Sequence, residues 1–588
     1  MYASSWATVL GLCVALLAGQ TAVCASPSVV LVVADDMGWG DLSLHGNTNL
    51  STPNLDRLAQ ESARFERFYV QPVCSPTRAE LLTGRYATRV GVTGVSRGEE
   101  RLDPSVTTIA EVLRNAGYRT AAFGKWHNGA QPPYHPLCRG FDHFYGFTSG
   151  HWASYFDPLL DLDGELTTGK GFLPDDLTDH TIRFIEQSDG EPFFALLAYN
   201  TPHSPMQVPD EWWDRHDGQV LKLRGTQSER EDVLHTRAAL AMVENLDWNV
   251  GRLMGALDRL DRAEDTVLIF LSDNGPNGHR YNQGLRGVKG STDEGGVRSP
   301  LFVRWRGAIV PRVITTPTAA IDLAPTIASL TGAAFQGAGD HDGQSLEPLL
   351  VDEAGVLPER ILFTTWNGSV AARRGDFVLD SQGRLYNHAN DPGQTSELSG
   401  DYDEQKKQLE AQVAAYRREV LRASRADDLP FTVGGEGPAL TQLPARDATA
   451  SGGVVRSNRY PNASYFTNWT TTEGAIAWPA EILSAGSYRA TVYYTCPASE
   501  VGSLVELSFE ANGRTSSASA RVETAHDPPL TASRRDRFPR AESDMKRFAP
   551  MVLGVIELPR GVGSLRLRAV EVPGAQVMDF RMLTLRRL

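Results

Sequence analysis

The sequence predicts an α/β domain built on a largely parallel β-sheet, followed by a separate all-β sandwich domain. Two patterns support this fold class. Before residue 280, four strong apolar runs alternate with segments of helical periodicity, as expected of parallel strands joined by helices. Beyond about residue 430, apolar and polar residues instead alternate with a period of two, which is typical of strands in a sandwich.

Length and composition agree with a chain of several folded domains. At 588 residues the chain is too long for one hydrophobic core, and its length indicates about two to four domains. Hydrophobic residues make up 41% of the chain and charged residues 22%, without a low-complexity tract, so disorder is not expected.

Residues 1–25 have the pattern of a cleaved secretory signal peptide. The run "VLGLCVALLAG" is too short to span a bilayer, and Val23 and Ala25 suit a small-residue cleavage site, although no Lys or Arg precedes the run. An apolar N-terminal strand is the alternative, but "SVVLVVAD" directly afterwards supplies that strand. We therefore expect a secreted or periplasmic protein without a membrane span.

Without the predicted signal peptide, three cysteines remain: Cys74, Cys138 and Cys496. Three cysteines cannot form a disulfide framework in an exported protein, so at least one must have another role. Cys496 shares a predicted strand face with apolar residues and fits a core position. The sequence assigns no role to Cys138.

Each of the four apolar runs ends in polar or charged residues. In chain order, these residues are Asp35 and Asp36, Lys125 and His127, His203, and Asp273 and Asn274. Any one of them could be a helix N-cap or an ordinary loop residue. Because ligands of open α/β sheets bind at the carboxyl ends of the strands, their joint occurrence predicts a single site.

One half of this set fits a hard cation. Asp35, Asp36, Asp273 and Asn274 offer only carboxylate and amide oxygens, which suit Ca²⁺ or Mg²⁺ better than zinc. Calcium is the preferred ion because it tolerates the irregular geometry of ligands drawn from two strand ends.

The other half is cationic and consists of Arg78, Lys125, His127, His203 and Lys289. Such a cluster, within a protein of formal net charge −14, predicts a pocket that attracts and stabilises an anionic substrate group.

The stretch "PVCSPTRAELLTGR" places Cys74 at the start of a predicted helix. Pro76 fits its first turn and Gly84 its end. A thiol at a helix N-terminus could be a low-pKa nucleophile paired with a histidine.

The same stretch resembles the motif of the type I sulfatases, Cys-x-Pro-x-Arg followed by Leu-Thr-Gly-Arg. Its residues here are Cys74, Pro76, Arg78, Leu82, Thr83, Gly84 and Arg85. The resemblance continues through "DDMGWGD", "GKWH", "PHSP", "SDNG" and "LRGVKGSTDEGGVRSP", and it covers about residues 27–425. Asn128 and Ser299 depart from residues common in the family, which affects the substrate expectation but not the reaction.

The resemblance implies a sulfatase domain of alkaline-phosphatase-like fold at residues 26–430, with a small α+β C-terminal subdomain at about 355–425. It also implies that Cys74 is converted to Cα-formylglycine, whose hydrated aldehyde is both nucleophile and metal ligand. One Ca²⁺ per chain would then be bound by residue 74 together with Asp35, Asp36, Asp273 and Asn274.

The resemblance further implies a role for each cationic residue. Arg78 and Lys125 hold the hydrated aldehyde, and Lys289 and His203 contact the sulfate. His203 protonates the departing alcohol oxygen, and His127 deprotonates the second hydroxyl so that the aldehyde re-forms and sulfate is expelled. A sulfate monoester needs such groups because it is anionic and its alkoxide leaves poorly.

Residues 431–588 are predicted to form the β-sandwich. They carry 18 Lys and Arg against 15 Asp and Glu, a net charge of +3. This domain could hold a polyanionic carbohydrate or only shield one face of the catalytic domain. The run "RRDRFPR", residues 534–540, could contact sulfates, but a solvated loop is the favoured interpretation because charge runs are usually solvated. The aromatic segment "GHWASYFDPLL", residues 150–160, could face a sugar or belong to the core or a loop.

The predicted function is hydrolysis of a sulfate ester on a sulfated carbohydrate. The alternatives are a phosphatase or phosphodiesterase of the same superfamily, which typically uses Ser or Thr and zinc, and a non-catalytic glycan-binding protein. Expected partners are the sulfated carbohydrate and a formylglycine-generating or anaerobic sulfatase-maturating enzyme. No nucleic-acid partner is expected.

Overall fold

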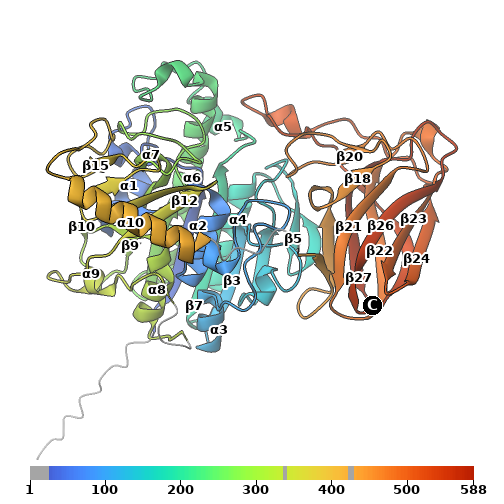
Figure 1. Ribbon diagram of the computed structural model, residues 1–588, viewed down its shortest axis with the longest axis horizontal. Coiled ribbons are helices and arrows are strands. Elements are labelled where there is room, and N and C mark those ends of the chain that lie inside the picture. Colours follow the sequence, from blue (N-terminus) through green and yellow to red (C-terminus); the bar gives the residue numbers. More distant parts are fainter. Residues whose placement is uncertain (1–25, 336–340, 422–428) are drawn as a thin grey trace, which may run out of the picture.

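The computed structural model describes residues 26–335, 341–421 and 429–588. The predicted signal peptide, residues 1–25, lies outside these residues. Figure 1 shows two lobes side by side, an α/β lobe and a β-sandwich lobe.

The α/β lobe contains an 11-stranded sheet in the order β10-β2-β9-β8-β1-β7-β3-β4-β5-β6, with β11 paired to β2. Its strands are β1 (Ser28–Asp35), β2 (Ala63–Tyr69), β3 (Arg119–Lys125), β4 (His143–Phe147), β5 (Leu159–Leu162), β6 (Glu165–Thr168), β7 (Phe193–Pro202), β8 (Thr266–Ser272), β9 (Arg298–Arg304), β10 (Arg312–Ile314) and β11 (Thr318–Ala319).

Helices cover both faces of this sheet. They are α1 (Pro53–Gln60), α2 (Cys74–Thr83), α3 (Ile109–Asn115), α4 (Leu173–Glu186), α5 (Asp210–Trp213), α6 (Val233–Arg259), α7 (Glu294–Val297), α8 (Leu323–Thr331) and α9 (Glu347–Val351). Every residue of β1 is buried, as expected of a central parallel strand. Val29, Leu31 and Val33 pack into one hydrophobic cluster and the alternate residues of β1 into another, so the sheet separates two cores.

The four predicted apolar runs are the adjacent central strands β8, β1, β7 and β3, and all three pairings between them are parallel. In register, Ala34 lies beside Ser272, and Ala198 lies beside both Val33 and Gly124. Their carboxyl ends therefore meet at one edge, which confirms the predicted α/β class.

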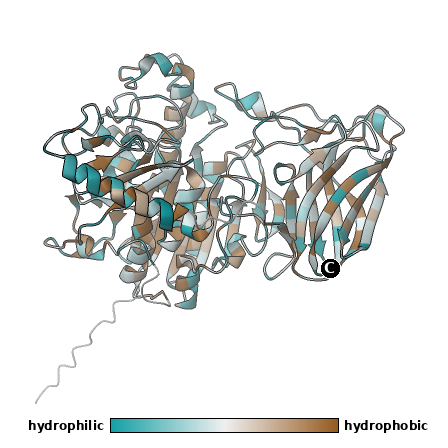
Figure 2. Cartoon of the chain, in the orientation of Figure 1, coloured by the Kyte–Doolittle hydropathy of each residue, from teal (hydrophilic) through white to brown (hydrophobic). Residues whose placement is uncertain are grey.

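A four-stranded antiparallel sheet follows, in the order β12-β13-β14-β15, and it packs against a long helix. Its elements are β12 (Leu362–Trp366), β13 (Ser369–Arg374), β14 (Phe377–Leu379), β15 (Leu385–Asn387) and helix α10 (Asp403–Glu419). Figure 2 shows that α10 is largely hydrophilic on the side facing the viewer.

The second lobe is a sandwich of two six-stranded sheets, in the orders β16-β21-β26-β23-β24 and β19-β20-β27-β22-β25, with β18 paired to β21 and β17 to β27. Its strands are β16 (Phe431–Val433), β17 (Leu440–Pro444), β18 (Thr449–Ser451), β19 (Val455–Arg456), β20 (Phe466–Thr467), β21 (Ala475–Ile482), β22 (Gly486–Thr495), β23 (Leu504–Ala511), β24 (Arg514–Arg521), β25 (Ala549–Leu558), β26 (Gly561–Glu571) and β27 (Asp579–Arg587).

Alternating residues of these strands form the sandwich core. Val505, Leu507 and Phe509 of β23 are buried together with Trp478, as the period-two pattern predicts. Cys496 is fully buried in the same cluster, in agreement with its predicted core position. Both sheets therefore turn an apolar face inward, and the all-β prediction for this lobe is confirmed.

The two lobes are joined by polar contacts over a long boundary. Gln442 donates to the Asp161 carboxylate at 2.8 Å, and Arg446 donates to Ser149 Oγ at 2.6 Å and pairs with Glu100 at 3.3 Å. Among the described residues, no helix combines the length and the hydrophobicity needed to cross a membrane.

A buried ion pair fixes the small antiparallel sheet to the main lobe. Arg373 of β13 donates to Glu294 of α7 at 2.8 Å and to the Thr292 carbonyl at 2.9 Å, and both charged side chains are fully buried. Burial by itself would raise the pKa of Glu294, but Arg373 outweighs this effect and holds the pKa below its ordinary value.

Arg373→Met should therefore lower the free energy of unfolding by about 3–5 kcal/mol, because Glu294 would remain as a buried charge without its arginine partner. Urea unfolding of the full chain measures this change. Arg374→Met is the matched control. The Arg374 side chain is 44% exposed and pairs with Glu359, and exposed ion pairs contribute about 0–1 kcal/mol. Equal losses in the two variants would contradict the assignment.

Candidate active site

The ends of the four central strands carry the polar residues that form the candidate active site. Asp35 ends β1 and Asp36 follows it, Lys125 ends β3, and Asp273 follows β8. Asp36 has a backbone φ of 67°, in the left-handed region that few non-glycine residues adopt. This turn directs its peptide N–H to the Asp273 carboxylate, at 3.2 Å.

Each carboxylate of this group is paired with a cation. Lys125 Nζ lies 2.7 Å from Asp35 Oδ2, and Lys289 Nζ lies 2.6 Å from Asp36 Oδ1. Arg78 donates two hydrogen bonds to Asp273 Oδ2, at 3.0 and 2.8 Å.

The cations also determine the protonation of the site. Burial would raise the pKa of Asp36, but Lys289, His203 and Lys125 hold it below its ordinary value. The Asp36–Lys289 pair also affects the lysine. Burial by itself would lower the pKa of Lys289, but the Asp36 carboxylate outweighs this effect and raises it. Both groups are therefore charged at neutral pH.

Three buried oxygens of the cluster have no hydrogen-bond partner among the described residues: Asp35 Oδ1, Asp36 Oδ2 and Asn274 Oδ1. Asn274 instead donates its Nδ2–H to Asp36 at 2.8 Å, so its carbonyl oxygen is left to face the cluster. Ligand atoms of Asp35, Asp36, Cys74 and His203 lie within 4.8 Å of one another. Because buried oxygens without a donor cost free energy, this donor set fits a bound divalent cation.

Cys74 is the first residue of α2, and the helix ends at Gly84 in the left-handed conformation. Its thiol lies 3.4 Å from Lys289 Nζ. Burial raises the pKa of this thiol to about 12, although Lys125 and Lys289 lower it in part. The thiol is therefore protonated at neutral pH, which argues against the low-pKa thiolate alternative.

His127 is buried with one ring nitrogen engaged and the other free. Its Nε2 lies 2.9 Å from the Val95 carbonyl oxygen, which can only accept, so Nε2 carries the proton. Nδ1 then holds a lone pair and has no hydrogen-bond partner in the described part of the chain. Burial and Lys125 lower the pKa of His127 well below its ordinary value, so this nitrogen is available as a base.

His203 has the opposite orientation. Its Nδ1 donates to the Ser204 carbonyl at 2.7 Å, and its Nε2 lies 3.8 Å from Asp36 Oδ2. Burial and Lys289 lower the pKa of His203 to about 4. A bound anion would offset the charge of Lys289, and His203 would then be protonated more readily.

A cavity of about 460 Å³ adjoins this cluster. Cys74, His127, His203 and Lys289 all face it, and the remaining predicted residues are linked to them by the contacts above. The structure thus brings together all ten residues predicted from the sequence.

The sandwich lobe also contributes to this cavity. The sequence analysis did not find Tyr460, Asn462 or Glu542, whereas Phe538 and Arg540 belong to the run 534–540, for which contact with sulfates was the less favoured interpretation. Glu542 accepts from Ser204 Oγ at 2.8 Å and lies 3.7 Å from His151. No sequence pattern could have indicated Glu542, because it lies 339 positions after His203 on an irregular loop. His151 does belong to the segment that was suggested to face the sugar.

Gly150, beside His151, is required because its backbone passes close to the His127 ring. A Cβ atom at this position would lie 2.1 Å from His127 Nε2. Only glycine therefore lets the 150–160 segment pass directly over the His127 ring.

Comparison with known proteins agrees with this geometry. A model of the Sulfatase family matches residues 27–333. Human arylsulfatase A is 35% identical over 388 residues, covering 59% of this chain and 72% of the relative. The N-acetylgalactosamine-6-sulfatase of Canis lupus familiaris is 31% identical over 398 residues, covering 61% and 72%. The structure of Ps i-CgsB in complex with k-i-k-neocarrahexaose has a TM-score of 0.62 at 27% identity, covering 68% of this chain and 95% of that one.

The fold and the strand-edge site are those of the alkaline phosphatase superfamily. Within it, the chain belongs to the sulfatase family and is a type I sulfatase. It is therefore a sulfuric ester hydrolase, as the sequence motifs predicted.

The unpartnered oxygens predict that a hard divalent cation stabilises the fold. Added Ca²⁺ should raise the melting temperature above that in a chelator, because a ligand at 100 times its Kd contributes about 2.7 kcal/mol. Asp36→Asn should lose most of this increase.

Asp41→Asn is the control, since Asp41 is also buried but is held by Arg280 at 2.6 Å. It should have a lower starting stability and keep the cation-dependent increase. A chelator without effect on the wild-type protein, or stabilisation by Zn²⁺ alone, would show the assignment to be wrong.

Proposed function

We propose that this sulfatase removes sulfate from a sulfated carbohydrate through a formylglycine formed from Cys74, with one Ca²⁺ per chain. The observation that carries the proposal is the position of Cys74 in a Cys-x-Pro-x-Arg motif, buried beside Lys289 and the unpartnered oxygens. The carbohydrate substrate is supported by two relatives, one named for a sugar sulfate and one bound to a neocarrahexaose.

The proposed ligands of Ca²⁺ are Asp35, Asp36, Asp273, Asn274 and the modified residue 74, whose oxygen would stand near the present Sγ position. The ion would polarise a sulfate oxygen and neutralise charge that develops on it. The hydrated aldehyde would supply a nucleophilic hydroxyl and a second hydroxyl on the same carbon.

The chain's own groups would hold the substrate and move the protons. Lys289, which remains cationic, would bind the sulfate, and Arg78 and Lys125 would fix the carboxylates and residue 74 in position. His203 Nε2 would give a proton to the departing alcohol oxygen. His127 Nδ1, whose lone pair is unengaged, would accept the proton of the second hydroxyl so that sulfate is expelled.

The alternative of a zinc-dependent phosphatase or phosphodiesterase has less support. Those enzymes typically use Ser or Thr as nucleophile, whereas this chain has Cys74. All of the proposed metal ligands, including the hydrated aldehyde of residue 74, are oxygen donors, which do not favour zinc. A non-catalytic glycan-binding protein would not need the full set of charged groups found in the cavity.

The remaining assignments are also proposals. We infer a signal peptide at residues 1–25 and export to the periplasm or the exterior from the N-terminal sequence pattern. The proposed catalytic domain is residues 26–430, with its subdomain at about 355–425, and the proposed accessory domain is residues 431–588. Maturation would require a formylglycine-generating or anaerobic sulfatase-maturating enzyme.

Cys74 should be found as formylglycine when the chain is produced in a host with the maturation machinery. Mass spectrometry of the peptide containing residue 74, with an aldehyde-specific hydrazide as a trap, measures the conversion. Cys138 and Cys496 are internal controls, because neither lies in the motif and both should remain thiols. Fully active enzyme in which residue 74 is entirely thiol would contradict the proposal.

His203→Ala should reduce turnover of sugar sulfates about 10²–10⁴-fold, because their alkoxide leaving groups need protonation. The loss should be much smaller for nitrophenyl sulfate, whose phenolate leaves without this help. Steady-state kcat/KM on both substrates measures the difference.

Lys289→Ala is the comparison variant, since it removes a sulfate contact common to both substrates and should depress both by similar factors. Equal losses for the two substrates in His203→Ala would remove the acid role from His203.

A further inference from the structure

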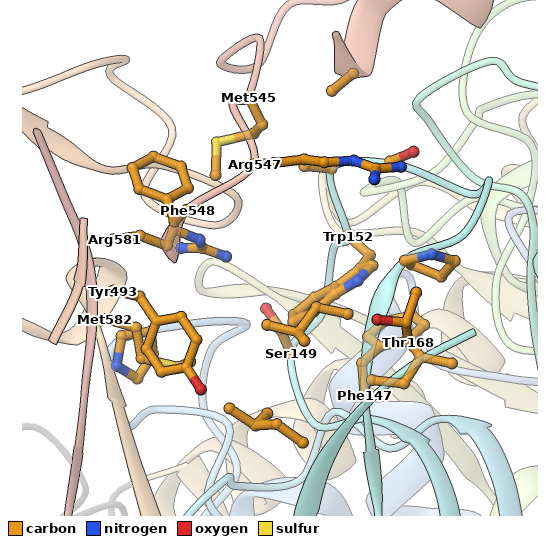
Figure 3. A pocket seen from close by; sticks show the side chains of 18 of the residues that line it. Phe147, Ser149, Trp152, Thr168, Tyr493, Met545, Arg547, Phe548, Arg581 and Met582 are labelled. Carbon is orange, nitrogen blue, oxygen red and sulfur yellow. The ribbon is translucent and has the colours of Figure 1, made fainter. Parts of the chain in front are cut away.

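A second cavity, larger than that of the active site, lies between the two lobes. Its volume is about 650 Å³, within the range of sites for small organic ligands. Figure 3 shows side chains of both lobes around it, with Phe147, Ser149, Trp152 and Thr168 on one side and Tyr493, Phe548, Arg581 and Met582 on the other. Arg581 extends from the sandwich lobe into the space between them.

The charges around this cavity are strongly unequal. Its cationic lining residues are Arg446, Arg534, Arg535, Lys546, Arg547 and Arg581, and its anionic lining residues are Asp157 and Asp161. Asp161 is already engaged by Gln442 and by the Gly164 N–H. The cavity therefore has an excess of positive charge in a chain whose formal net charge is −14.

Four of these cations have no carboxylate within ion-pair distance in the described part of the chain. Arg446 is paired with Glu100 and Asp447, and Lys546 is paired with Asp579 and Asp527, whereas Arg534, Arg535, Arg547 and Arg581 have no such partner. Arg534, Arg535 and Arg547 are exposed and Arg581 is half-buried, so these guanidinium groups are free to bind a ligand. Guanidinium groups match tetrahedral oxyanions geometrically.

Arg581 is the most constrained of the four. Its guanidinium donates to the Ser464 carbonyl at 2.8 Å, which leaves its other N–H groups unassigned. Burial and Arg446 lower the pKa of Arg581 to about 10. The positive charge of Arg581 is therefore incompletely compensated by its surroundings. An anion beside it would restore a favourable environment.

Aromatic rings complete the lining. Trp152 and Phe156 come from the α/β lobe, and Tyr493 and Phe548 come from the sandwich lobe. Arg535 packs over the Phe156 ring at 4.2 Å, which holds its charge at the cavity. Aromatic faces with adjacent polar groups suit pyranose rings, which present apolar C–H faces and polar edges.

The cavity adjoins the active site through shared segments. Gly150 and His151 face the active-site cavity, whereas Ser149 and Trp152 on either side of them face the second cavity. The sandwich loop does the same, since Phe538 to Glu542 line the active site and Arg534, Arg535 and Met545 to Phe548 line the second cavity. Both cavities therefore lie along the same boundary between the lobes.

The loop that connects them is firmly held. Arg537 pairs with Asp210 and donates to the Val208 carbonyl, and Arg540 donates to the Ala153 carbonyl at 2.9 Å. The expectation of a solvated loop for residues 534–540 is thus wrong for Arg537 and Arg540. With the loop fixed by these two arginines, Arg534 and Arg535 remain directed to the cavity.

We propose that the cavity between the lobes is a second binding site for the sulfated carbohydrate, holding sulfated sugars that flank the ester in the active site. The proposal rests on the proposed function and deepens it, because it makes the enzyme selective for chains with several sulfates. The arginines bind the flanking sulfate groups, and the aromatic rings pack against the sugars.

Binding can be tested without turnover in a Cys74→Ala background of the full chain. The probes are six-sugar fragments of carrageenan, chondroitin sulfate, heparin and fucoidan, measured by calorimetry, and the tightest is compared with its desulfated form. Arg535→Gln, Arg547→Gln and Arg581→Gln should each weaken binding of the sulfated fragment about tenfold, the usual loss for one charge-assisted hydrogen bond. Arg535 and Arg547 are exposed, so their replacement does not disturb the core.

Arg566→Gln is the matched control, because Arg566 is an exposed arginine of the same lobe on the outer face of β26, away from the cavity. It should bind the fragment as the parent does. Equal affinity for the desulfated fragment, or for an unsulfated polyuronate of the same length, would overturn the assignment to sulfate esters. Absence of binding by any fragment would also overturn it.

The same variants in the matured enzyme separate this proposal from the proposed function. The ratio of kcat/KM for the six-sugar fragment to that for nitrophenyl sulfate should fall about tenfold in Arg547→Gln and stay constant in Arg566→Gln. An enzyme that hydrolyses nitrophenyl sulfate but shows the same ratio in both variants would overturn the second site alone. Failure to hydrolyse any sulfate ester would instead overturn the proposed function.

Discussion

Three carboxylates buried at one edge of a sheet are the constraint on which the rest of this structure depends. Asp35, Asp36 and Asp273 are each almost fully buried, and an isolated buried carboxylate costs several kcal/mol. Each is therefore paired with a cation, from β3, from α2 or from the loop that contains Lys289. Those pairings fix the positions of elements that are far apart in the chain.

These ion pairs leave several oxygens of the site without a hydrogen-bond donor, and this indicates what the site can bind. Oxygens of Asp35, Asp36 and Asn274 have no donor among the described residues, while Lys289 and Arg78 already occupy the other acceptor positions. A site of this kind is suited to a cation and an anion together, because each would compensate the other's charge. The two histidines differ in tautomer because different backbone carbonyls hold them, which fits the different proton-transfer roles proposed for them.

The sandwich lobe is part of this site and not an independent appendage. Its loop places Glu542 against Ser204 and His151, and the same loop carries Arg534, Arg535 and Arg547 of the second cavity. Substrate length and sulfation pattern would then be recognised at the boundary between the lobes, while the chemistry stays at the strand ends. A division of this kind allows selectivity to change through one loop without disturbing the buried charges.

The sequence by itself determined the fold class and the chemistry of the α/β lobe. Long apolar runs predict buried parallel strands, and parallel strands must end at a common edge, so Asp35, Lys125, His203 and Asp273 could be expected to converge. The motif around Cys74 predicted the family. These inferences succeed because they depend on local periodicity and short-range spacing.

Only the tertiary structure decided which side chains pair and which remain free. The contact of Glu542 with Ser204, the clearance at Gly150 and the unpaired state of Arg581 depend on how two separately folded lobes pack. Arg534 and Arg537 are alike in sequence, yet one faces a cavity and the other pairs with Asp210. Packing between distant segments leaves no periodic trace in the sequence, so those contacts could not be predicted from it.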